Sequence, residues 1–196
     1  MEGRPEMAAV MILMAAVFDF LDGFAARLLK VHSDIGGELD SLSDVVSFGV
    51  APAFAVFCAC SGMVRYAAFV FPVSAAVRLA KFNISSDQKT VFTGLPTPPA
   101  AILAATLPLC SNVFGNDQTV AETAMVAIVA LLSALMVSKM RFFSLKVINL
   151  KWNENRLRYV LVAAAVVFVL LWKWAGVGLS VLFYIMLSLL SQKRNG

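Results

Sequence analysis

The chain has 196 residues, of which 60% are hydrophobic and only 14% are charged, and its mean hydropathy is +0.83. In soluble domains about a quarter of the residues are charged. This composition therefore excludes a soluble globular, disordered or disulfide-scaffold protein and indicates a membrane protein. We attribute the net charge of +4 to Lys and Arg in cytoplasmic loops rather than to nucleic-acid binding. The single histidine, His32, is far in sequence from the three cysteines, so no zinc site is predicted.

Long apolar stretches, separated by charged or Pro- and Gly-containing segments, predict an all-α, polytopic transmembrane helix bundle. Each stretch is close to the roughly 20 residues that one bilayer span requires, or reaches that length with its flanking polar residues. Gly94, Pro96, Pro98 and Pro99 mark a loop and the start of the helix that follows it. We expect about seven helices, at 7–30, 35–60, 64–82, 97–113, 119–139, 157–173 and 176–191.

The basic residues predict how the bundle is oriented. If the turn after Arg27 is cytoplasmic and the helices alternate, thirteen of the sixteen Lys and Arg lie on the cytoplasmic side. The other three, Arg4, Arg65 and Lys173, lie on the opposite side. The positive-inside rule favours this orientation, with the N-terminus outside and the C-terminus inside.

Acidic residues are concentrated near the start of the chain. A charged side chain at the centre of a spanning helix costs roughly 2.5–3.5 kcal/mol on insertion scales, so a group of them there indicates a function. Six of the twelve Asp and Glu fall within one short segment: Asp19, Asp22, Asp34, Glu38, Asp40 and Asp44.

The spacing of four aspartates predicts a metal site. Asp19 and Asp22 are three residues apart on one predicted helix, and Asp40 and Asp44 are four apart on the next, so each helix presents a pair on one face. Two antiparallel helices joined by a short turn would direct both pairs into one cavity near the cytoplasmic surface. Clustered carboxylates repel unless cations intervene, and all-oxygen ligation favours Mg²⁺ or Mn²⁺.

Small residues beside the aspartates leave two interpretations open. Gly23 keeps one face of the first helix low, which permits either close helix packing or a substrate against the backbone. Its position next to Asp22 favours a substrate. Arg27 would suit a phosphate oxygen, although it would also lie naturally at the cytoplasmic interface with its side chain extended toward water.

The pattern Asp19-x-x-Asp22-Gly23-x-x-Ala26-Arg27, followed after eight residues by Gly36-x-x-x-Asp40-x-x-x-Asp44, resembles the signature of the CDP-alcohol phosphotransferase family at every fixed position. The stretches 40–52, 78–83, 94–98 and 136–139 resemble its phosphatidylserine synthase branch. The likeness runs from about residue 15 to residue 150, and the last two helices match only as hydrophobic spans.

The resemblance implies transfer of a phosphatidyl group from CDP-diacylglycerol to L-serine, giving phosphatidylserine and CMP in phospholipid biosynthesis. By the same likeness, Asp19, Asp22 and Asp40 hold one divalent ion, and Asp19, Asp40 and Asp44 hold a second. Asp44 is also the expected catalytic base that takes the proton of the serine hydroxyl. Gly23, Arg27 and Ser33 correspond to family positions that contact the CDP part of the donor.

Three further residues are candidates for binding the serine acceptor. A zwitterionic amino acid needs a cation for its carboxylate and an acceptor for its ammonium group. Arg78, Lys81 and Asn83 lie at the predicted cytoplasmic end of a helix and meet part of this need. Arg78 and Lys81 are equally well explained as basic anchors on the cytoplasmic side.

The sequence is expected to form a single integral membrane domain over residues 1–196. The family pattern has a further hydrophobic helix before the motif, whereas only 18 residues precede Asp19. A fragment, a late start codon and a naturally short variant all remain possible, as does a homodimer. Two other functions also stay open: the same chemistry with glycerol phosphate or inositol as acceptor, and a divalent-cation transporter using the intramembrane aspartates.

Overall fold

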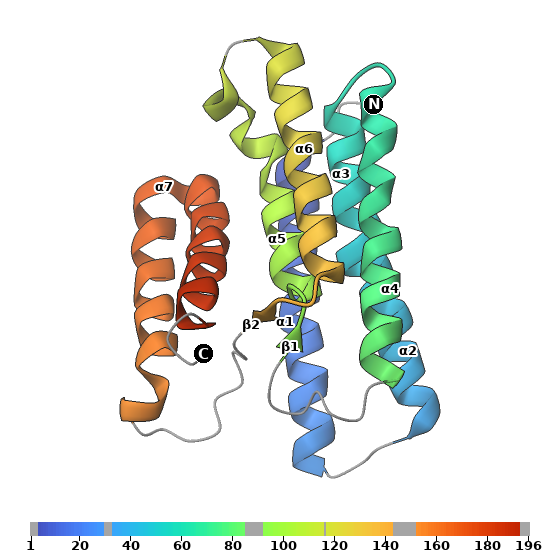
Figure 1. Ribbon diagram of the computed structural model, residues 1–196, viewed down its shortest axis with the longest axis vertical. Coiled ribbons are helices and arrows are strands. Elements are labelled where there is room, and N and C mark those ends of the chain that lie inside the picture. The colour runs from blue at the N-terminus through green and yellow to red at the C-terminus, as the bar shows by residue number, and fades with distance from the viewer. Residues whose placement is uncertain (1–3, 30–32, 85–91, 116, 143–151, 193–196) are drawn as a thin grey trace.

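The structure, a computed structural model, describes residues 4–29, 33–84, 92–115, 117–142 and 152–192. It is a helical bundle, which confirms the predicted all-α class (Figure 1). Its α-helices are α1 (Pro5–Leu29), α2 (Asp34–Val45), α3 (Ala51–Ala59), α4 (Val70–Ile84), α5 (Thr97–Thr106), α6 (Gln118–Val137) and α7 (Trp152–Gln192). A π-helix, η1 (Val46–Val50), two 3₁₀ helices, η2 (Val64–Phe69) and η3 (Pro108–Phe114), and two short strands, β1 (Phe92–Thr93) and β2 (Arg141–Phe142), complete it.

The seven helices expected from the sequence are all present, although their boundaries are divided differently. The segments α2, η1 and α3 continue into one another and form the helix expected at 35–60. Likewise η2 and α4 form the helix expected at 64–82, and α5 and η3 form the one expected at 97–113. The long α7 contains both of the last two predicted helices, 157–173 and 176–191.

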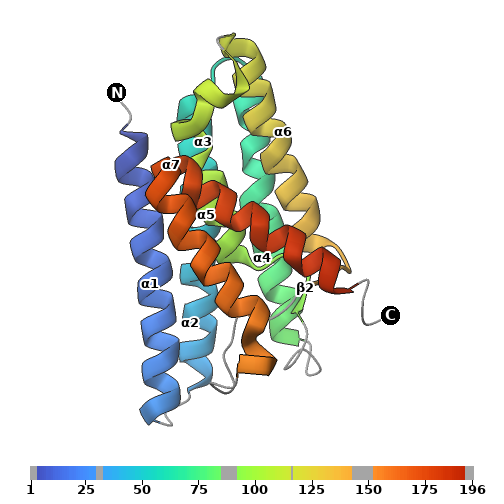
Figure 2. The same ribbon diagram turned by 90° about the vertical axis from the view of Figure 1, so that its left-hand side faces the viewer.

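Helix α7 is a hairpin of two helical arms. Lys173 has non-helical dihedral angles, φ 48° and ψ −118°, and the chain reverses direction there (Figures 1 and 2). Gly176 lies three residues after Lys173, and a Cβ atom at this position would lie 2.0 Å from the carbonyl oxygen of Phe168. Glycine therefore allows the second arm to start against the backbone of the first.

The chain is an integral membrane protein. Within the described residues, five helical segments are long and apolar enough to cross a bilayer, or six if α5 and η3, bent by 63°, form one span. The part of α7 from Arg158 to Leu190 counts as one of these segments, although its 33 residues exceed the roughly 20 that a single span requires. Many large apolar side chains are exposed, among them Phe18 and Phe20 on α1, as expected of a surface that faces lipid.

Helix α5 is at the centre of the bundle and contacts α1, α3, α6 and α7. Its alanines explain this position, because small side chains allow neighbouring helices to approach closely. Ala101 and Ala105 pack with Ala9 and Ile12 of α1 and with Phe48 of η1, all of them buried. The other side of α5 belongs to the larger core, to which Leu103 and Ala104 contribute.

A short ladder ties the start of α5 to the end of α6. Strands β1 and β2 pair antiparallel, with Phe92 opposite Phe142. The amide of Gly94 donates to the carbonyl of Met140 at 2.8 Å, and the amide of Leu95 donates to the carbonyl of Leu135 at 3.0 Å. These bonds fix the segment before α5 against the last turn of α6.

Gly94 should be difficult to replace. Its φ is +82°, and an added Cβ would lie 2.2 Å from the carbonyl oxygen of Met136, whereas Gly62 has φ +60° with open space around it. Gly62→Ala should therefore cost about 1 kcal/mol of stability from its left-handed backbone alone. Gly94→Ala should cost at least about twice as much and lower the Tm of the protein in detergent further. Equal Tm values for the two variants would contradict this packing.

Candidate active site

The aspartates of the motif come from two adjacent helices. Asp19 and Asp22 lie in the second half of α1, and Asp40 and Asp44 lie in α2. Helix α2 starts at a capped end, because the Ser33 hydroxyl accepts a hydrogen bond from the Gly36 amide at 3.1 Å. Capping by serine satisfies one of the free amides of the first turn and fixes where the helix begins.

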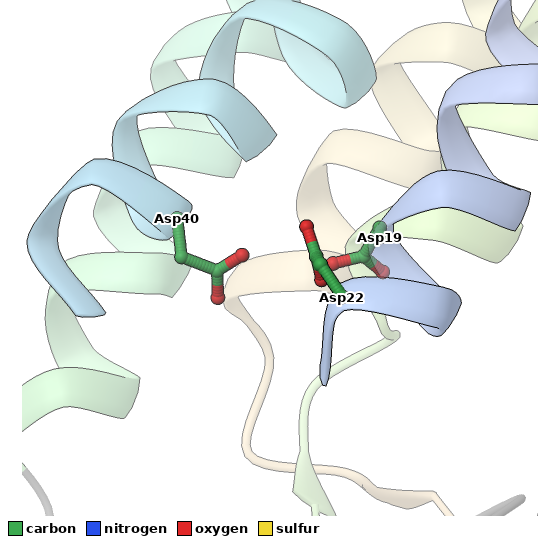
Figure 3. A group of neighbouring side chains, drawn as sticks. All are labelled: Asp19, Asp22 and Asp40. Carbon is green, nitrogen blue, oxygen red and sulfur yellow. The ribbon is translucent and has the colours of Figure 1, made fainter. Parts of the chain in front are cut away.

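Three of the four aspartates converge. One carboxylate oxygen from each of Asp19, Asp22 and Asp40 lies within 4.8 Å of the other two. Figure 3 shows Asp40 directed from α2 toward Asp19 and Asp22 on α1. Asp19 is half-buried, whereas Asp22 and Asp40 are exposed, so the group is open to water.

The residues of this group are suited to hold a hard divalent cation. Two oxygens on opposite sides of an octahedral Mg²⁺ at about 2.1 Å are about 4.2 Å apart, so only small side-chain adjustments separate the observed spacing from direct ligation. The donor set is entirely carboxylate oxygen, which favours Mg²⁺ or Mn²⁺ over softer metals. The structure therefore brings together a group that can bind a metal ion.

Asp44 lies deeper than this group. It is half-buried, and its ligand atoms are not among the three that converge in the described residues. It interacts electrostatically with Asp19 and Asp40 of this group and with Arg78 of α4. Asp44 is therefore within electrostatic reach of both the carboxylates and a cation of α4.

The three predicted donor contacts have different surroundings. Beside Gly23, an added Cβ would meet nothing within 4 Å, so the described residues do not require glycine there for helix packing. Ser33 caps α2 and also lines an open groove of about 730 Å³ that reaches Asn83. The side chain of Arg27 lies outside the described part of the structure, although its backbone belongs to α1.

The three predicted serine contacts are divided between two places. Arg78 and Lys81 line a cavity of about 240 Å³ between α4 and the end of α6. Asn83 instead lines the groove beside α2, and its amide donates to the Ser41 hydroxyl at 3.0 Å.

Two residues near Arg78 were not singled out by the sequence. Thr97, fully buried, accepts a hydrogen bond from the Nη1 group of Arg78. Lys139 lines the same cavity as Arg78 from the end of α6. In the sequence, Thr97 and Lys139 belong only to the stretches 94–98 and 136–139 that resemble the family. No local spacing relates either residue to Arg78, because they are far from it along the chain.

These features define a polytopic helical membrane protein with a carboxylate site at one end of the bundle. The family model described as CDP-alcohol phosphatidyltransferase matches residues 1–132. The chain belongs to the CDP-alcohol phosphatidyltransferase family.

Several relatives carry related names. The chain is 36% identical over 171 residues to a CDP-diacylglycerol–serine O-phosphatidyltransferase of Helicobacter pylori, an alignment that covers 83% of this chain and 70% of the relative. It is 45% identical over 94 residues to a protein of the same name from Methanocaldococcus jannaschii, covering 47% of this chain and 46% of the relative. It is also 38% identical over 107 residues to an archaetidylserine synthase of Methanothermobacter thermautotrophicus, covering 52% of this chain and 46% of the relative.

Removing one converging carboxylate should weaken metal binding. Asp40→Asn keeps the shape of the side chain but removes a negative charge, so the affinity for Mn²⁺ should fall by at least about tenfold. Titration of the detergent-solubilised protein with Mn²⁺, followed by electron paramagnetic resonance, measures this change.

Glu38→Gln is the matched control. Glu38 is an exposed acid on the same helix and removing it also changes the charge by one, but it is not part of the converging group. Its Mn²⁺ affinity should stay within twofold of that of the unmodified protein. An equal loss in both variants would show that general charge, rather than ligation, holds the ion.

Proposed function

We propose that this chain is a CDP-diacylglycerol–serine O-phosphatidyltransferase, which transfers the phosphatidyl group to L-serine and releases CMP. The convergence of Asp19, Asp22 and Asp40 at the end of two adjacent membrane helices carries this proposal. The names of relatives at 36–45% identity support serine as the acceptor.

The carboxylates would receive the diphosphate of the donor. Asp19, Asp22 and Asp40 would hold one Mg²⁺ or Mn²⁺, and Asp19, Asp40 and Asp44 a second. Bound there, two divalent ions neutralise the charge of the diphosphate and of the departing CMP. The open space beside Gly23 lets the nucleotide approach the backbone of α1, with Arg27 and Ser33 as further contacts.

Asp44 would act as the general base. The serine hydroxyl oxygen forms a bond to the phosphorus that carries the diacylglycerol, the bond from that phosphorus to the CMP oxygen breaks, and the hydroxyl proton moves to an Asp44 carboxylate oxygen. Its electrostatic interactions with both the acidic group and Arg78 support this role, because a base must reach both the donor and the acceptor. Arg78, Lys81 and Asn83 are the proposed contacts for serine.

The site would face the cytoplasm, with residues 1–196 acting as a single membrane domain. The excess of basic residues on this side of the bundle supports the orientation. CDP and serine are polar and require a water-accessible cavity, while the acyl chains of the donor stay in lipid.

Release of CMP from CDP-diacylglycerol in mixed micelles tests the proposal. With Mg²⁺ or Mn²⁺ present, CMP should form when L-serine is added and should not form when the metal is removed with a chelator. Glycerol phosphate and inositol are tested in parallel. CMP formation with either of them but not with serine would support the phosphatidyl transfer but contradict serine as the acceptor. Metal uptake by vesicles that contain the protein, without CMP formation, would favour a transporter.

Asp44→Asn should separate donor binding from transfer. Asparagine is similar in shape but cannot accept the serine proton, so the rate of CMP release should fall by about 10²- to 10⁴-fold. Binding of CDP-diacylglycerol in the presence of Mn²⁺ should be retained, as measured by equilibrium binding. Turnover equal to that of the unmodified protein would remove Asp44 from the role of base.

Gly23→Ala should weaken the binding of CDP-diacylglycerol without destabilising the fold. A Cβ at this position meets no described atom within 4 Å, so the Tm should stay within about 2 °C of that of the unmodified protein. The KM for CDP-diacylglycerol should rise at least about tenfold, because the methyl group occupies the space proposed for the nucleotide. An unchanged KM would show that the donor does not approach α1 at Gly23.

A further inference from the structure

The cavity of about 240 Å³ between α4 and the end of α6 has a strongly one-sided charge. Arg78 and Lys81 line it from α4, and Lys139 lines it from the residues that follow α6. The described residues that line it include no acid. Its volume is many times the roughly 30 Å³ that a water molecule occupies in the liquid, so it can accept a small anionic group.

One hydrogen-bond donor of Arg78 has no partner among the described residues. The Arg78 side chain is only 8% exposed, and its Nε group is buried without a hydrogen bond to any described residue. A buried, charged donor left unpaired costs free energy, so such a group is expected to find a partner when the site is occupied. A carboxylate is suited to this position because it accepts hydrogen bonds from the guanidinium and is attracted by the two lysines.

Thr97 limits how Arg78 can turn. The hydrogen bond from Nη1 of Arg78 to the Thr97 hydroxyl holds one end of the guanidinium at the start of α5. Thr97 is itself fixed, since it is fully buried and directly follows the segment in which Gly94 and Leu95 bond to Met140 and Leu135. The same ladder therefore positions both Arg78 and the residues after α6 that include Lys139.

Arg78 links the cavity to the carboxylate site. It lines the cavity and interacts electrostatically with Asp44, so a ligand held by Arg78 would be within electrostatic reach of the proposed base. In L-serine the carboxylate and the hydroxyl are on neighbouring carbons. A carboxylate in the cavity and a hydroxyl toward Asp44 would thus belong to one small molecule.

We propose that this cavity binds the carboxylate of the acceptor amino acid, with Lys139 as a contact that determines specificity and Thr97 as the residue that positions Arg78. The inference rests on the proposed function and adds to it the group by which the acceptor is distinguished from an alcohol without a carboxylate. Phe82 and Met136 form apolar parts of the cavity wall.

Kinetics with two acceptors test the inference on the full chain in mixed micelles. L-serine and L-serine amide, which lacks the negative charge, are compared in the unmodified protein, Lys139→Gln and Lys139→Arg. Lys139→Gln should raise the KM for serine about tenfold and lower the preference for serine over the amide, as a ratio of kcat/KM, about tenfold. The KM for CDP-diacylglycerol should stay within twofold, and Lys139→Arg should keep most of the preference.

Arg4→Gln is the matched control, because it also removes one positive charge but from an exposed residue before α1, at the other end of that helix from the aspartates. The KM and kcat for L-serine and for L-serine amide should both stay unchanged in this variant. Thr97→Val removes the hydroxyl with little change in size and should raise the KM for serine severalfold, while Thr97→Ser should restore it.

Three outcomes are distinguishable. No serine-dependent CMP release by the unmodified protein would overturn the proposed function and this inference with it. An active protein whose preference for serine over the amide is unchanged in Lys139→Gln and in Thr97→Val would overturn the inference alone. A fall in Tm or kcat with an unchanged preference would show that Lys139 only offsets the partial negative charge at the end of α6, and this too would overturn the inference.

Discussion

Mutual repulsion among carboxylates is the constraint on which this structure depends. Asp19, Asp22 and Asp40 have oxygens within 4.8 Å of one another at the end of a membrane bundle, where isolated charges are already costly. Such a group persists only if the helices that carry it are held by other contacts and if water or cations reach it. Both conditions are met, since α1 is fixed by packing against α5 and η1, and two of the three carboxylates are exposed.

The positions of the other helices follow from this requirement. Alanines make α5 thin enough to lie at the centre, which lets α1 approach it closely. The π-helix η1 joins the acidic α2 to the apolar α3 within one continuous helical segment. Gly49 in η1 packs closely against α4, because a Cβ atom added at this glycine would lie only 3.2 Å from the Cα atom of Pro72. The carboxylate site is therefore built on helices that are anchored on their other faces.

The sequence was sufficient to predict the features that depend on the spacing of nearby residues. Apolar stretches located all seven helices, and the spacing of Asp19, Asp22 and Asp40 predicted that they would face one another. It was insufficient for contacts between distant segments. The bond between Arg78 and Thr97, and the separation of Asn83 from Arg78, depend on how α4 packs against the start of α5 and against α2. No periodicity within either helix encodes that packing.

The bundle has an acidic region on α1 and α2 and a basic region on α4 and after α6. Under the proposed function, the acidic region is the donor side of the site and the basic region is the acceptor side. On that proposal, the carboxylates on α1 and α2 would bind cations and, through them, the diphosphate of the donor, whereas the basic residues on α4 and after α6 would bind a carboxylate directly. Asp44 and Arg78, which interact electrostatically, link these two regions. The diphosphate of the donor and the carboxylate of serine both carry negative charge, although serine as a whole is zwitterionic, so an enzyme that brings these two groups together needs a separate source of positive charge for each. Bound metal would supply positive charge on the donor side, and fixed basic side chains would supply it on the acceptor side. The proposal thus accounts for the lysine and arginine residues that line the cavity, where further aspartates would repel the carboxylate of serine.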